Sequence, residues 1–156
     1  MSVFSISEVL QFAVGIEEAG ENFYRQLSSK FKEENLQNVF NFLADEECKH
    51  REVFLNMIVE IEKYEPPENY PQEYFAYLRS YADNIIFSNE VEKEKKQCFR
   101  NILSALDFAV RRELDSILYY QEMRGVVPEG EHSTIDKVIG EERKHFLKLL
   151  EIKGKL

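Results

Sequence analysis

The chain has 156 residues, of which 44% are hydrophobic and 31% are charged, and its formal net charge is -9. These values exclude intrinsic disorder, are typical of a soluble globular protein and predict a single domain spanning residues 1–156. Basic residues are not clustered among aromatic ones, so we expect no nucleic-acid partner. Two cysteines, Cys48 and Cys98, are too few for a disulfide framework or a four-cysteine metal site, and we interpret both as small buried hydrophobic side chains.

The first 20 residues contain a short apolar run, but no basic residue precedes it and Glu17 and Glu18 end it. A signal peptide begins with basic residues, and a membrane-spanning helix needs roughly 20 consecutive apolar residues. We therefore expect a cytoplasmic protein with no membrane association.

Apolar residues at helical spacing predict two long helices in the first half of the chain. A capping box at residues 5–8, with Ser5 as its N-cap, opens a helix that ends near Ser29. The second helix is predicted over residues 34–63 and ends before the prolines at 66–67, which cannot continue it.

The pattern weakens over residues 64–97, which contain three prolines, many aromatic residues and a run of charges at 90–96. We predict one or two short helices here, one of them over residues 72–82, laid across the outside of a bundle. We interpret the charged run as a solvated helix face or linker. A connection of this length allows the two helices that it joins to run parallel.

Two further long helices are predicted in the second half of the chain. The third spans about residues 99–124, with Gly125 as a C-cap, and the fourth spans about residues 134–153. The four long helices predict an all-α fold, a four-helix bundle with a long crossover between its second and third helices.

The motif E-x-x-H lies within two of these helices, at Glu47 to His50 and at Glu142 to His145. Residues three apart project from the same face of a helix, so each pair is a candidate metal ligand pair. The motif alone is weak, because Glu/His pairs also occur on solvated helix surfaces. A third copy ends at His132 within a loop that contains Pro and Gly, and we interpret it as a solvated coincidence.

The two helical copies are stronger evidence for a metal site than the motif alone, because they belong to an internal repeat. Glu17 is followed seven residues later by Tyr24, and Glu113 is followed seven residues later by Tyr120. The glutamate of E-x-x-H comes 30 residues after Glu17 and 29 residues after Glu113. The chain is therefore predicted to hold two helix pairs, each with a Glu/Tyr helix followed by an E-x-x-H helix.

Two alternatives remain open at this point. A shift in helical register would replace Glu17 by Glu18 or Glu21 on the inward face, although the spacing to Tyr24 favours Glu17. Tyr24 and Tyr120 either hydrogen-bond the metal ligands or are ordinary core tyrosines with satisfied hydroxyls.

The repeat brings four glutamates and two histidines to the inward faces of four helices at a similar depth. Four carboxylates without counter-charge would be very costly in a core, and two divalent cations would balance them. Carboxylate and imidazole ligands suit iron or manganese, and the absence of thiolates argues against structural zinc. The candidate ligands are Glu17, Glu47, His50, Glu113, Glu142 and His145.

The sequence resembles the rubrerythrin branch of the ferritin-like superfamily, in the form without an appended rubredoxin domain. The segments that carry the resemblance are EEAGENFYRQL, ADEECKHREVF, RRELDSILYYQEM and GEERKHFLKLL. The resemblance implies a ferritin-like four-helix bundle, two iron ions (manganese or a mixed pair being alternatives) and a homodimer. The resemblance implies that Glu47 and Glu142 are bridging carboxylates. It implies that Glu17 and His50 bind one metal, and that Glu113 and His145 bind the other. It also implies that Tyr24 and Tyr120 form hydrogen bonds to ligands.

Two features depart from the family pattern. Rubrerythrins have a further glutamate, linked to peroxide reduction, at the position of Ser116, and they carry a mononuclear iron on two Cys-x-x-Cys pairs that this sequence lacks. Electrons would therefore come from an external donor such as a rubredoxin. The first hypothesis is a di-iron oxidoreductase that reduces hydrogen peroxide or dioxygen. The alternatives are a non-catalytic metal-binding or iron-handling protein, and a metal-free bundle that serves as an interaction module.

Overall fold

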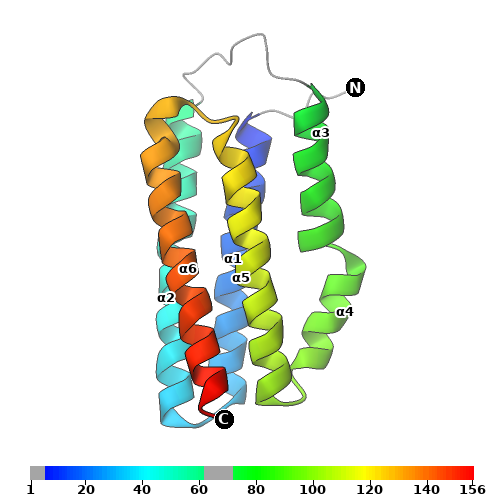
Figure 1. The fold of residues 1–156 in the computed structure, drawn as a ribbon, viewed down its shortest axis with the longest axis vertical. Coiled ribbons are helices and arrows are strands. Elements are labelled where there is room, and N and C mark those ends of the chain that lie inside the picture. The colour runs from blue at the N-terminus through cyan, green and yellow to red at the C-terminus, as the bar shows by residue number, and fades with distance from the viewer. Residues whose placement is uncertain (1–5, 62–71) are drawn as a thin grey trace.

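The computed structural model describes residues 6–61 and 72–156. These residues form a bundle of helices and contain no strand, so the all-α prediction is confirmed (Figure 1). Among them, no helix is both long enough and apolar enough to span a membrane. The elements in chain order are α1 (Ile6–Lys30), α2 (Glu34–Ile61), α3 (Gln72–Tyr81), the π-helix η1 (Ala82–Ile86), α4 (Asn89–Cys98), α5 (Ile102–Arg124), the 3-10 helix η2 (Glu129–Glu131) and α6 (His132–Gly154).

The four long helices α1, α2, α5 and α6 lie side by side, and α3 and α4 run along the outside of the bundle (Figure 1). Short turns join α1 to α2 and α5 to α6, so each pair is an antiparallel hairpin. The crossover through α3, η1 and α4 returns the chain to the end at which α2 began, so α2 and α5 run parallel. This is the predicted ferritin-like bundle with its long second connection.

The core has two apolar halves separated by a polar layer. On every long helix, the buried glutamate or E-x-x-H pair stands between residues of one half and residues of the other. One half includes Leu10, Ile16, Phe54, Ile117, Tyr120 and Ile139. The other half includes Phe23, Leu27, Leu43, Leu106, Ala109 and Leu149. Apolar packing on both sides therefore holds the polar residues at one level of the bundle.

The helix boundaries differ from the predictions where local capping decides them. The third long helix begins at Ile102, because Asn101 adopts an extended backbone and its side chain accepts a hydrogen bond from the backbone of Ser104. The charged run 90–96 belongs to a separate helix, α4, which Ser88 caps in the same way. The predicted N-cap at Ser5 and the prolines at 66–67 lie outside the described residues.

The crossover is attached to the bundle by polar contacts to α5. Arg112 donates hydrogen bonds to the carbonyls of Ile85 and Ile86 at the end of η1. The hydroxyl of Tyr81 bonds to the carbonyl of Asp115, and Tyr74 bonds to Glu122. These bonds fix α3 and η1 against α5, with the η1 contacts close to the polar layer.

Candidate metal centre

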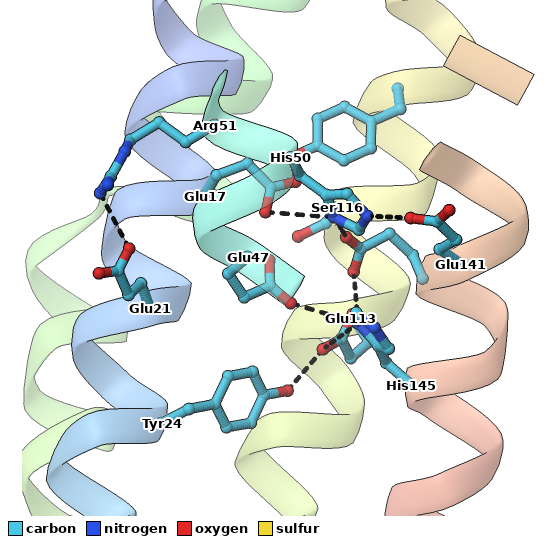
Figure 2. A network of polar contacts seen from close by, with 12 residues as sticks. Glu17, Glu21, Tyr24, Glu47, His50, Arg51, Glu113, Ser116, Glu141 and His145 are labelled. Atoms are coloured by element: carbon cyan, nitrogen blue, oxygen red, sulfur yellow. Dashed lines mark hydrogen bonds and ion pairs between the residues drawn. The ribbon is translucent and has the colours of Figure 1, made fainter. Parts of the chain in front are cut away.

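All six candidate ligands lie together inside the bundle. Figure 2 shows Glu17, Glu47, His50, Glu113 and His145 among them. Each of the four long helices contributes one glutamate, and α2 and α6 each add a histidine one turn later. The exposed fraction of every one of these residues is 4% or less. The cluster consists of Glu17, Glu47, His50, Glu113, Glu142 and His145.

The six residues form two overlapping groups of four. Oxygen and nitrogen atoms of Glu17, Glu47, His50 and Glu142 lie within 4.8 Å of one another, and the same holds for Glu47, Glu142, Glu113 and His145. Glu47 and Glu142 belong to both groups. This geometry fits a site for two metal ions in which two carboxylates face both positions.

The polar atoms at the centre of the cluster do not satisfy one another. Atoms that lack an aligned hydrogen bond include Oε2 of Glu17, Oε1 of Glu47, Oε1 of Glu142 and Nδ1 of both histidines. Nδ1 of His50 lies only 2.6 Å from Oε1 of Glu142, and Nδ1 of His145 lies 3.3 Å from Oε1 of Glu47. Buried polar atoms that converge without hydrogen bonds are costly unless another group occupies the space between them, so the donor set fits metal ions.

The pKa shifts of the buried glutamates and histidines also fit a site for metal ions. Burial raises the pKa of Glu47 well above its ordinary value, and Glu142 raises it further. Burial lowers the pKa of each histidine, but Glu142 and Glu47 outweigh this effect and raise the pKa of both His50 and His145 to about 9. Without metal, the cluster therefore holds protons that metal ions would displace on binding.

Two tyrosines connect the two halves of the repeat. The hydroxyl of Tyr24 on α1 donates to Oε1 of Glu113 on α5, and the hydroxyl of Tyr120 on α5 donates to Oε1 of Glu17 on α1, each across 2.5 Å. The bonds are reciprocal, since each tyrosine serves the glutamate of the other repeat. The sequence left open whether these tyrosines bond to candidate ligands or are ordinary core residues. In the structure, both hydroxyls bond to candidate ligands.

The register of α1 follows the repeat. Glu17 is fully buried, whereas Glu18 is exposed and Glu21 forms an ion pair with Arg51 outside the cluster (Figure 2). One turn after Glu17, the glycine at position 20 allows Glu47 to approach closely. A Cβ atom built there would lie 3.3 Å from Oε2 of Glu47.

Comparison with known proteins supports the resemblance to rubrerythrins. The sequence profile of the rubrerythrin family matches residues 8–153. The chain belongs to the rubrerythrin family. A similar crystal structure is that of a Thermotoga maritima protein proposed to be a ferritin-like diiron-carboxylate protein, which is 31% identical to this chain in sequence. The match covers 95% of this chain and 93% of the Thermotoga chain, and the two structures superpose with a TM-score of 0.69. A search of curated proteins finds no match.

This rubrerythrin has a cavity of about 60 Å³ beside the cluster, bounded by α1, η1, α4 and α5. The carboxylates of Glu47 and Glu113 form its inner wall, and its sides are mostly apolar, with Phe23, Phe87 and Phe108 among them. Glu92 and Lys95 of α4 also line it. The sequence pattern did not predict this role for α4, because the charged run there has the composition of an ordinary solvated helix.

Ser116 lies on the wall of the same cavity, where a glutamate is expected from the rubrerythrin pattern. Its hydroxyl donates to the carbonyl of Arg112 in the preceding turn of α5, at 2.9 Å. The side chain is thus bonded to its own helix, adds no carboxylate to the cluster and leaves the adjoining space open.

The remaining residues singled out in the sequence lie away from the cluster. His132 is the first residue of α6 and its Nε2 faces the carbonyl of Val127 at 3.3 Å. Cys48 is partly exposed and contacts Arg51, while Cys98 is buried on α4, where burial raises its pKa to about 11. The interpretation as a buried hydrophobic side chain is therefore confirmed for Cys98 and wrong for Cys48.

Proposed function

We propose that this rubrerythrin binds two iron ions in the bundle and reduces hydrogen peroxide or dioxygen with electrons from an external donor protein such as a rubredoxin. One observation carries the proposal: two four-residue groups of carboxylates and imidazoles share Glu47 and Glu142. This arrangement presents two adjacent metal positions with a common pair of oxygen ligands.

In this proposal, the residues divide between the two positions by proximity. Glu17 and His50 serve one position and Glu113 and His145 serve the other, while Glu47 and Glu142 serve both. Iron ions bound there would supply the electrons that reduce the oxidant, as redox-active metals do in such sites. The tyrosine hydroxyls keep two of the carboxylates oriented, since a hydrogen bond to an outer oxygen restricts rotation of the carboxylate.

The cavity beside the cluster supports a small oxidant. Its volume of about 60 Å³ has room for a molecule of a few atoms, between phenylalanine side chains and the charged residues Glu92, Lys95 and Arg112. Glu47 and Glu113 at its inner end give such a molecule direct access to the proposed metal positions.

The test is metal analysis of protein purified without oxygen, followed by rapid mixing of the reduced protein with peroxide. We expect about two irons per chain and repeated oxidation when a chemical reductant is supplied. The variant Glu47→Ala should bind fewer metal ions. Less than one metal ion per chain in the natural protein would contradict the di-metal assignment.

A second candidate function is non-catalytic binding or handling of iron, and Ser116 is the observation that favours it. Its hydroxyl is engaged by the backbone of its own helix, so the cavity wall lacks the carboxylate that peroxide-reducing rubrerythrins carry there. Two bound irons together with a single oxidation and no turnover would support this function over the first.

A further inference from the structure

The two ring nitrogens of His50 face different surroundings. Nδ1 points into the cluster, toward Glu17 at 3.6 Å and Glu142 at 2.6 Å. Nε2 points the other way and lies 2.5 Å from Oε2 of Glu141 (Figure 2). An ionised carboxylate only accepts hydrogen bonds, so Nε2 carries the proton and donates it to Glu141.

This bond determines how His50 is presented to a metal. A neutral imidazole protonated at Nε2 has its lone pair at Nδ1, which is the nitrogen directed at the cluster. The bond also restricts rotation of the ring, because the imidazole is tied on one side to α6 and packed on the other within the bundle. The exposed fraction of the His50 side chain is 2%, and that of Glu141 is 29%. Glu141 therefore reaches the buried ring from the edge of the bundle.

The second histidine has no equivalent support. His145 occupies the matching place in the second repeat, and the residue that corresponds to Glu141 in the first repeat is Glu46. Glu46 bonds instead to Lys49 on its own helix, at 3.2 Å. Throughout residues 6–61 and 72–156, no side chain is found bonded to Nε2 of His145. The two halves of the cluster share the same ligand types but differ in this one contact.

We propose that Glu141 is a positioning residue for His50, and that its contact with Nε2 makes the Glu17/His50 position bind metal more tightly than the Glu113/His145 position. The inference rests on the proposed metal-binding function and adds to it the order in which the two metal ions bind. The first metal ion enters the His50 position, and the second enters the His145 position at a higher metal concentration. Hydrogen bonds of this type are worth about 10-fold to 100-fold in metal affinity.

The experiment is a titration of the metal-free full-length chain with Co²⁺, a redox-stable probe whose absorption spectrum reports ligand binding. The natural protein should bind two ions per chain in two separable steps. Glu141→Ala should weaken the first step by about tenfold or more. Glu141→Gln should weaken it less, because its amide oxygen still accepts the Nε2 hydrogen bond. Circular dichroism of each metal-free variant verifies that the bundle is folded, and the isosteric glutamine variant keeps the test available if the alanine variant does not fold.

Glu46→Ala is the matched control, since it removes the same charge from the equivalent position of the other repeat. It should leave the first step within about twofold, because the Glu46 carboxylate lies within 4.8 Å of His50 and Glu141 but is hydrogen-bonded to Lys49 and to neither histidine ring. Proton NMR at one equivalent of Co²⁺ adds a direct readout. The Nε2 proton of His50 should give one paramagnetically shifted, slowly exchanging signal that disappears in D₂O, and in Glu141→Ala that signal should be lost to fast exchange with solvent.

Three results would overturn the inference. Equal affinities of the natural protein and Glu141→Ala would show that the contact has no effect on metal binding. Equal losses in Glu141→Ala and Glu46→Ala would reduce the effect to net charge. A shifted signal that survives in Glu141→Ala would exclude the positioning role. If the natural protein bound no Co²⁺ at all, the proposed function would fail as well, so the two failures are distinguishable.

Discussion

The hydroxyl of Tyr24 on α1 donates a hydrogen bond of 2.5 Å to Glu113 on α5, and both side chains are buried. We predict that Tyr24→Phe destabilises the metal-free protein by about 1–3 kcal/mol, because it leaves a buried carboxylate without its donor. The same variant should lower metal affinity, since Glu113 loses the contact that orients it. Urea unfolding in the presence of EDTA and a Co²⁺ titration measure the two effects.

Tyr119→Phe is the control for this variant. Tyr119 is equally buried, but its hydroxyl donates to the backbone carbonyl of Val9 and not to a candidate ligand. The Tyr119→Phe variant should therefore be less stable than the natural protein but should bind metal with the same affinity. A Tyr24→Phe protein with unchanged affinity would show that the tyrosine has no role beyond the core.

Glu47→Gln should have opposite effects on the stability of the metal-free and metal-loaded forms. Burial and the charge of Glu142 raise the pKa of Glu47, so its ionised form opposes folding when no metal is present. A neutral amide of the same shape should raise the melting temperature in EDTA. It should lower the melting temperature in saturating metal, because a shared ligand is lost. Calorimetry under both conditions tests the reversal, and a loss of stability in both forms would contradict it.

The stability of the metal-free protein should fall as pH rises from about 6.5 to about 9. The pKa values of His50 and His145 are raised in the folded protein from the ordinary 6.5 to about 9. A histidine whose pKa is raised by folding stabilises the folded state fully below pH 6.5, and this stabilisation is lost as the pH rises toward 9. The lowered pKa of Glu142 acts in the opposite direction, but its contribution is complete above 4.5 and constant in this window. Thermal unfolding in EDTA at a series of pH values measures the slope.

Metal affinity should rise over the same pH window, because protons and metal ions compete for the histidine nitrogens. A variant in which both His50 and His145 are replaced by glutamine should show a flatter stability profile. If the slope stayed the same in that variant, titration of the histidines would not be its cause.

Gly20→Ala should weaken metal binding while leaving the metal-free bundle folded. The added Cβ would lie 3.3 Å from Oε2 of Glu47, so the carboxylate has to move away from its present position. Gly140→Ala is the matched control, because no atom lies within 4 Å of the Cβ position on α6. It should gain about 0.5–1 kcal/mol of helix stability without changing metal affinity. Equal metal affinities for the two variants would contradict the steric argument.

The sequence was sufficient to predict that the six candidate ligands lie on the buried faces of the long helices. Glu17 could be chosen over Glu18 because Tyr24 follows Glu17 by seven residues, as Tyr120 follows Glu113, and the burial of Glu17 agrees with that choice. The length of the connection between α2 and α5 allowed a parallel arrangement, and the structure shows that the two helices run parallel (Figure 1). The ligand roles of these residues remain predictions, which the metal-binding experiments test.

Other features depend on contacts between helices, for which a single sequence contains no signal. Glu141, which precedes the candidate ligand Glu142, is one position away from the inward stripe of the helix and has the pattern of a solvated residue. Only the packing of α6 against α2 brings it to His50. The π-helix η1 likewise depends on its contacts with Arg112 of α5, and the pairing of Tyr24 with Glu113 depends on how the two hairpins meet.

The reciprocal tyrosine bonds give the centre an approximate two-fold symmetry, in which one helical hairpin is the image of the other. A dimer of two identical hairpins would carry the same set of ligands, so this architecture is compatible with descent from a duplicated and fused ancestor. The crossover through α3, η1 and α4 has no counterpart within either hairpin, and it covers one flank of the centre. The crossover thus gives the candidate metal centre two chemically different sides, with the cavity on the side that it lines.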